Sequence, residues 1–234
     1  MNAPDTTVGL LGTVPCFAGL GAKVLQALAL RTHPKSFGAG QPVFTEGDPC
    51  RHLYLLESGR VKFYRTSADG REQTMKLFEH PGDMFCIPSA FRTGSHIVSA
   101  RAVTEARLRL LDVEAVNRLA EAHPSMALKL VAVAGEHMMH LVALAEDLSL
   151  KTAIARLAKH LCELAAGERA DTRGELRLSR DRLPEEELAS MLGTVRVHVS
   201  RSLMSLVGTG AIDLDRRFVR IRNLTALKQI AEGK

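Results

Sequence analysis

Glycine and proline interrupt the chain at short, regular intervals between about residues 37 and 111, for example at Gly47-Asp48-Pro49 and Pro81-Gly82-Asp83. Short runs of β character such as LYLL, RVKFY and HIVSARAV lie between these turns. Many short strands separated by regular turns are typical of an antiparallel sandwich or barrel. We therefore expect a β-barrel, with a hairpin at Ser67–Arg71 because Asp69-Gly70 tolerates positive φ.

A helical pattern replaces the β pattern after Leu111. A short helix opens at Asp112 and should end before His123-Pro124, because proline excludes its predecessor from helical geometry. From Ser125 to about Asp147 the sequence contains no proline and only one glycine, Gly135. Apolar residues alternate three and four positions apart there, as in the seam of a two-stranded coiled coil. We expect these residues at a dimer interface, the alternative being that they pack on the chain's own barrel: Val131, Ala134, Met138, Leu141, Ala145 and Leu148.

Another helix is expected from Thr152, a capping residue, to about Ala166, ending at Gly167. The polar stretch 167–180 indicates a loop followed by the short strand ELRLS. The excess positive charge lies in this last third of the chain. Residues 1–150 contain 15 Lys and Arg against 15 Asp and Glu, whereas residues 151–234 contain 16 against 11. Such a distribution is expected of a module that contacts phosphates, although a solvated basic face would look the same.

Residues 184–206 read PEEELASMLGTVRVHVSRSLMSL. Pro184 followed by three glutamates suits the first turn of a helix, and Gly193 can adopt the positive φ of a tight turn. The next helix, from Thr194 or Val195, should bury Val195, Val199 and Leu203. The segment AIDLDRRFVRIRN then indicates two short strands about Asp215-Arg216. This order predicts a winged helix-turn-helix.

The order of barrel, long helix and winged helix-turn-helix resembles the Crp/Fnr family of transcription regulators. So do the segments EGDPCRHLYLLESGRVKFYR, HPGDMFC and EEELASMLGTVRVHVSRSL, and the resemblance extends from about Phe17 to Leu227. It implies an α+β fold in which a jelly-roll barrel of the cyclic-nucleotide-binding type fills residues 1–122. A dimerisation helix and hinge would occupy 123–150, and a DNA-binding domain 151–234.

The resemblance also implies a homodimer on a palindromic double-stranded DNA operator, with contact to RNA polymerase if the protein is an activator. Arg201 matches an arginine that pairs with guanine, a bidentate geometry suited to O6 and N7. Val197 departs from the glutamate often found at its position, so the family's usual half-site is not expected at one base pair. The residues expected to contact DNA are Thr194, Arg196, Val197, His198, Ser200, Arg201, Arg216 and Arg217.

Members of the family that bind cyclic AMP carry a glutamate and an Arg-Ser pair after the Gly-Asp turn. Here Ile87 and His96-Ile97 occupy those positions, so cyclic AMP is not expected. An iron-sulfur cluster is not expected either, because Cys16 is the only cysteine near the N-terminus. The residues expected to line the effector pocket are Phe85, Cys86, Ile87, Pro88, Arg92, His96, Met138 and Leu141.

The segment HPGDMFC is similar to the carbon-monoxide-sensing haem regulators, in which the cysteine at the position of Cys86 ligates haem. Pro88 stands where those proteins have a histidine, so haem would need a replacement ligand such as His96, His137 or His140. The effector would then be a diatomic gas or a redox signal. Alternatively, Cys86 is a small buried hydrophobic residue, as most free cysteines are.

Other classes of protein are less consistent with the sequence. The N-terminus MNAPDTTVGLLG lacks the features of a signal peptide, and no stretch offers roughly 20 uncharged apolar residues, so we expect a cytoplasmic protein without a membrane partner. A cupin-like metalloenzyme is an alternative, but His52, His80 and His96 stand apart and no catalytic motif occurs. We therefore expect no enzyme. The other alternative is a ligand-binding module that never touches DNA.

Overall fold

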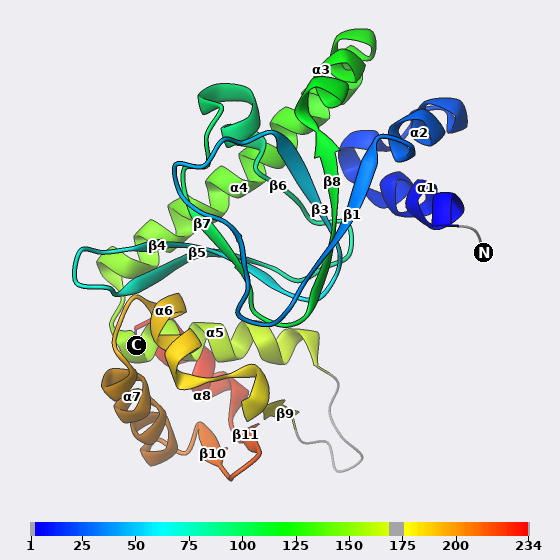
Figure 1. Ribbon diagram of the computed structural model, residues 1–234. Coiled ribbons are helices and arrows are strands. Elements are labelled where there is room, and N and C mark those ends of the chain that lie inside the picture. The colour runs from blue at the N-terminus through cyan, green and yellow to red at the C-terminus, as the bar shows by residue number, and fades with distance from the viewer. Residues whose placement is uncertain (1–2, 169–175, 234) are drawn as a thin grey trace. The chain divides into compact units, whose positions relative to one another are not determined.

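The computed structural model describes residues 3–168 and 176–233 (Figure 1). They form two compact units. The first contains the residues up to Arg65 together with Met75–Leu141, and the second contains Thr66–Thr74 and the residues from Val142 onwards.

Two four-stranded antiparallel sheets form the body of the first unit, in the orders β1-β8-β3-β6 and β2-β7-β4-β5. The expected β-barrel is thus confirmed, and so is the turn at Ser67–Arg71, where the N–H of Ser67 donates to the carbonyl of Arg71 at 2.8 Å. The strands are β1 Thr32–Phe37, β2 Pro42–Phe44, β3 His52–Ser58, β4 Val61–Thr66, β5 Glu72–Phe78, β6 Met84–Phe85, β7 Ser99–Ala102 and β8 Ala106–Asp112.

The apolar residues of β3 and β8 form the centre of this core. Leu53, Leu55 and Leu56 of β3 are fully buried, as are Leu108 and Leu111 of β8. Four consecutive buried residues in β3, from Leu53 to Leu56, break the simple in-and-out alternation of a half-exposed strand, because both faces of β3 are covered. A single π-helical turn, η2 (Ser89–Thr93), follows β6.

Two helices that the sequence pattern did not predict precede the barrel, α1 (Ala3–Thr13) and α2 (Ala22–Ala29), with a 3-10 turn η1 (Pro15–Phe17) between them. Leu11, Phe17 and Leu28 are buried in the same hydrophobic core as the barrel strands. These helices therefore extend the barrel core.

After the barrel, α3 (Val113–Ala122) ends at His123, as the following proline predicts, and α4 (Pro124–Leu150) begins. Met126 and Leu130 are the buried residues of α4. Among the described residues, α4 is the one helix long and apolar enough, by length and composition, to cross a membrane. Glu136 interrupts the apolar residues of α4, so the helix is not an uncharged stretch of about 20 residues, in agreement with the sequence analysis.

The second unit is a small helical domain with a three-stranded sheet of order β10-β11-β9. The expected strand ELRLS is present as β9, whereas most of the expected loop before it lies outside the described residues. Helix α8, which the sequence analysis missed, is capped by Asn223, whose side chain accepts the N–H of Ala226 at 2.9 Å. The elements are α5 Ala153–Gly167, β9 Leu176–Ser179, η3 Arg180–Arg182, α6 Glu185–Leu192, α7 Arg196–Gly208, β10 Ile212–Leu214, β11 Phe218–Ile221 and α8 Leu224–Ala231.

Candidate functional site

The pair α6 and α7 has the geometry of a helix-turn-helix. Gly193 ends α6 with φ +60°, the left-handed conformation that glycine adopts without steric cost. On the inner side of the pair, Leu188 and Leu192 of α6 are buried, together with Val199 of α7. The predicted turn and second helix are therefore present.

The outer face of α7 carries the residues expected to contact DNA. Arg196, Val197, His198, Ser200 and Arg201 are all exposed, and Thr194 before the helix is half-buried. Val195 was expected in the core but is 40% exposed, because it is the residue that precedes the first turn of α7. The buried side of α7 consists of Val199, Ser202, Leu203 and Leu206.

Two glutamates at the start of α6 lie beside the first arginine of α7. Arg196 Nε is 3.4 Å from Glu185 Oε2, and Arg196 Nη1 is 3.7 Å from Glu186 Oε1. Arg180 Nη2 is 3.6 Å from the other oxygen of Glu185. Arg201, five residues further along α7, is also exposed.

The hairpin of β10 and β11 forms a wing with an ordered tip. The Asp215 carboxylate accepts the backbone N–H groups of Arg217 at 2.7 Å and Phe218 at 2.8 Å. These bonds hold the pKa of Asp215 below its usual value. Arg216 and Arg217 are exposed at this tip. A groove between the wing and α7 is lined by residues that include Ser200, Met204, Leu214 and Arg216. An exposed arginine-bearing helix beside a basic hairpin can follow a DNA groove and its phosphates.

Helix α4 presents an apolar face to solvent. Val131, Met138 and Leu141 of the expected interface are exposed by 68%, 61% and 43%, and Val142 by 56%. Ala145 is also exposed, whereas Ala134 and Leu148 are half-buried.

The end of α4 is tied to α5 by ion pairs and carbonyl contacts. Asp147 pairs with Lys151 at 2.9 Å and with Lys159. Arg156 Nη1 donates to the carbonyl oxygens of Asp147 and Leu148, both at 3.4 Å, and of Lys151 at 2.8 Å. Burial acts to raise the pKa of Asp147, but the hydrogen bonds from both lysines outweigh it and the pKa lies below its usual value.

The residues expected in the effector pocket separate into two groups. Phe85, Cys86, Ile87 and His96 are buried in the barrel, and Cys86 Sγ lies 3.6 Å from His96 Nδ1. Pro88 and Arg92 are exposed on the turn after β6, and Met138 and Leu141 are exposed on α4. The structure also brings Cys50 to Cys86 and His96, with the three ligand atoms within 4.8 Å of one another. Sequence reasoning missed Cys50, because 36 residues separate it from Cys86.

Haem ligation by Cys86 and His96 together does not fit this arrangement. Two axial ligands lie on opposite faces of a flat macrocycle, which must pass between them. Here sulfur and nitrogen are 3.6 Å apart, and the His96 ring is stacked on Phe44 with ring centroids 3.6 Å apart. Of the other two histidines considered, His137 packs against Phe78, and burial together with Lys76 lowers its pKa to about 4. His140 Nε2 is 3.0 Å from the carbonyl oxygen of Met75.

Each of the two units matches a known domain family. Residues 34–123 match a cyclic nucleotide-binding domain, and residues 155–230 match a Crp-like helix-turn-helix domain. The chain is 31% identical to a CRP-like cAMP-activated global transcriptional regulator of Mycobacterium tuberculosis, over 95% of this chain and 98% of that protein. It is also 31% identical to the cyclic AMP receptor protein of Thermus thermophilus, over 94% and 97%. A Crp/Fnr-type structure from Eubacterium rectale has the same fold, with TM-score 0.74, 20% identity, and coverage of 93% of this chain and 98% of that one.

A sensor-type barrel joined to a winged helix-turn-helix defines the protein as a DNA-binding transcription regulator. The chain belongs to the Crp/Fnr family. Because the relatives are transcription regulators, the expectation that the chain is not an enzyme is confirmed, and the cupin-like alternative is set aside.

Proposed function

We propose that the protein is an effector-responsive regulator that binds a palindromic operator as a homodimer. The observation that carries this proposal is the exposed face of α7, where Arg196, Ser200 and Arg201 are all open to solvent. Base edges in the major groove are read by side chains on such a helix, whereas exposed arginines of a wing contact phosphates. Arg201 is the residue assigned to a guanine, and Arg216 and Arg217 are assigned to the backbone.

The exposed face of α4 supports the homodimer. A second copy of α4 is the occupant that suits it, because the apolar residues repeat at the three-and-four spacing of a two-stranded coiled coil. A lipid partner would leave the Glu136 carboxylate within the apolar layer. Dimerisation would hold two recognition helices about 34 Å apart, one turn of DNA.

The effector proposed here is not cyclic AMP, although two relatives are named for it. A cyclic phosphate requires a fixed cation or a set of N–H donors, and a ribose requires a polar partner. The buried side chains at the corresponding positions are Ile87 and His96, while Arg92 is exposed. Titration calorimetry with cyclic AMP should therefore detect no binding at micromolar concentrations. Saturable binding with a matching gain in operator affinity would overturn this part of the proposal.

We further propose that the effector acts through the Asp147–Lys151 segment, by changing the fraction of dimers whose recognition helices are correctly spaced. A ligand shifts such an equilibrium only as far as its affinities for the two arrangements differ. If residues 151–234, dimerised through a flexible tether, bound the operator as tightly as the activated full chain, this hinge model would be wrong.

Selection from a random-sequence duplex library tests the DNA-binding function directly. The full chain should enrich a two-fold symmetric sequence, and its affinity should fall steeply as salt rises, because phosphate contacts release counterions. Should no sequence be enriched and no DNA be retained at low salt, the chain would be a ligand-binding module that does not touch DNA. RNA polymerase contact would be tested only on an operator obtained in this way.

A further inference from the structure

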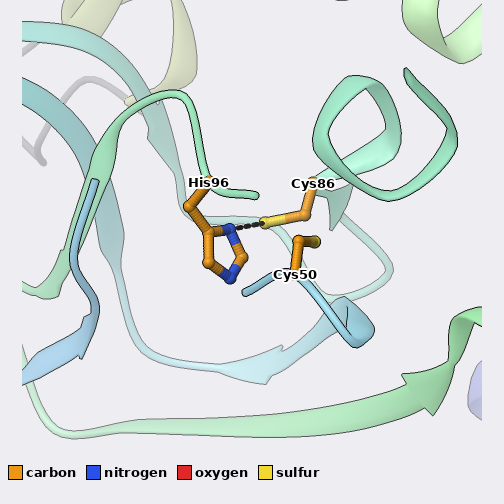
Figure 2. Close-up of side chains that lie close together, drawn as sticks. All are labelled: Cys50, Cys86 and His96. Atoms are coloured by element: carbon orange, nitrogen blue, oxygen red, sulfur yellow. Dashed lines mark hydrogen bonds between the residues drawn. The ribbon is translucent and has the colours of Figure 1, made fainter. Parts of the chain in front are cut away.

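Three metal-ligating side chains meet inside the barrel: Cys50, Cys86 and His96. Figure 2 shows the His96 ring directed at the Cys86 sulfur, with Cys50 beside them. Each is at most 6% exposed, and they come from three separate segments, before β3, after β6 and before β7. All four cysteines of the chain are free thiols. The cluster is therefore a buried set of two sulfurs and one imidazole nitrogen.

The segments that carry Cys50 and His96 are fixed to each other by the backbone. The N–H of His96 donates to the carbonyl of Asp48 at 2.9 Å, and the N–H of Cys50 donates to the carbonyl of Gly94 at 2.8 Å. The His96 ring lies flat on Phe44, with an angle of 8° between the planes. The ring orientation is thus set by packing, with Nδ1 facing the Cys86 sulfur.

The backbone of Cys86 adopts an unusual conformation. Its φ of +73° is the only positive value among non-glycine residues of the described chain. Such conformations cost on the order of 1–3 kcal/mol and cluster at functional sites. A glycine would avoid the cost, but it would remove the sulfur from the cluster.

The distance between Cys86 Sγ and His96 Nδ1 matches that between two ligands of a single small ion. A tetrahedral centre with bonds of about 2.3 Å to sulfur and 2.0–2.1 Å to nitrogen separates these two ligand atoms by about 3.6 Å. The separation between Cys86 Sγ and His96 Nδ1 is 3.6 Å. Thiolate and imidazole ligands together favour zinc or monovalent copper over magnesium, calcium or manganese.

We propose that Cys50, Cys86 and His96 bind one thiophilic d10 metal ion, Zn²⁺ or Cu⁺, within the barrel. Water would complete the coordination of zinc. Binding displaces the thiol protons, which pass to solvent, so both sulfurs bind as thiolates and no electron is transferred.

Metal titration of the reduced full chain tests the proposal without DNA. Zn²⁺ uptake is measured by competition with a chromophoric chelator, Cu⁺ uptake by competition with a Cu⁺-specific chelator, and Co²⁺ serves as a spectroscopic probe of zinc sites. We expect one equivalent of zinc or copper per chain. With Co²⁺ we expect thiolate-to-cobalt charge-transfer bands in the near ultraviolet and the visible bands of tetrahedral cobalt.

Five variants test which residues bind the ion. C50S, C86S and H96Q should each weaken binding by more than the roughly 10–100-fold that loss of an outer-shell partner costs. The matched controls C16S, buried in the same core, and C162S, on α5, should bind as the wild type does. Thermal unfolding of the metal-free variants shows whether each barrel has folded.

Failure of the wild-type chain to bind Zn²⁺, Cu⁺ or Co²⁺ while all four thiols remain reduced would overturn the proposal. So would binding that survives in folded C50S, C86S and H96Q. Because no DNA is present, either result would leave the DNA-binding function untouched.

Discussion

Arg196 Nε, at the start of α7, lies 3.4 Å from Glu185 Oε2, at the start of α6. The positive charge of Arg196 is therefore partly offset by an acidic group on α6. We expect E185Q to tighten binding to any duplex by about two- to tenfold, because a charge that pairs with Arg196 and repels phosphates is lost.

Fluorescence anisotropy with a random-sequence duplex at two salt concentrations measures this effect. E121Q makes the same charge change on α3 and should leave the affinity near that of the wild type. Unchanged or weaker binding by E185Q would show that Glu185 does not restrain Arg196.

The ionisation of Asp147 should make the stability of the second unit depend on pH. Its folded-state pKa is depressed by hydrogen bonds from Lys159 and Lys151, although burial acts in the opposite direction. A carboxyl with a depressed pKa contributes stability above its unfolded pKa of about 3.9, and this contribution is lost as the pH falls through the folded value.

Urea unfolding of the wild type and D147N, followed by a probe in the second unit, tests this prediction. D147N should be less stable at pH 7, and the difference should shrink as the pH falls below about 4. E146Q, at the exposed neighbouring position, is the control. A difference that stayed constant over this range would mean that ionisation of Asp147 does not stabilise the fold.

Charged substitutions on the exposed face of α4 test the dimer. V131E or M138E would place two uncompensated carboxylates in the interface, so each should convert the dimer to monomers at micromolar concentration. Sedimentation velocity reports the mass. A143E adds the same charge at an exposed position on another side of α4 and should remain dimeric. Dimers of all three variants would place the interface elsewhere.

The fold was largely predictable because its patterns are local. The turns of the barrel, the proline between α3 and α4, and Gly193 between α6 and α7 each act within a few residues of sequence. Helices α1 and α2 were missed, because Leu11, Phe17 and Leu28 are buried only once the barrel provides the core.

The candidate sites also differ in how far the sequence alone predicts them. Most of the residues expected to contact DNA lie within residues 194–201, so helical periodicity predicts which of them are exposed. Val195 was the exception, since it precedes the first helical turn. The cysteine cluster depends on backbone hydrogen bonds that join residues near 48 to residues near 96, and no periodicity in the sequence encodes that pairing.

Substitution of Arg201 tests the central claim, that the exposed face of α7 reads base sequence. The operator selected from the random library and a shuffled duplex are compared by anisotropy at one salt concentration, for the wild type, R201A and R217A. R201A should lose about 1–3 kcal/mol on the operator and little on the shuffled duplex, as expected for a lost bidentate base contact. R217A, at the wing tip, should lose similar affinity on both. Equal losses by R201A on the two duplexes, or none on either, would contradict the assignment of α7 as the recognition helix.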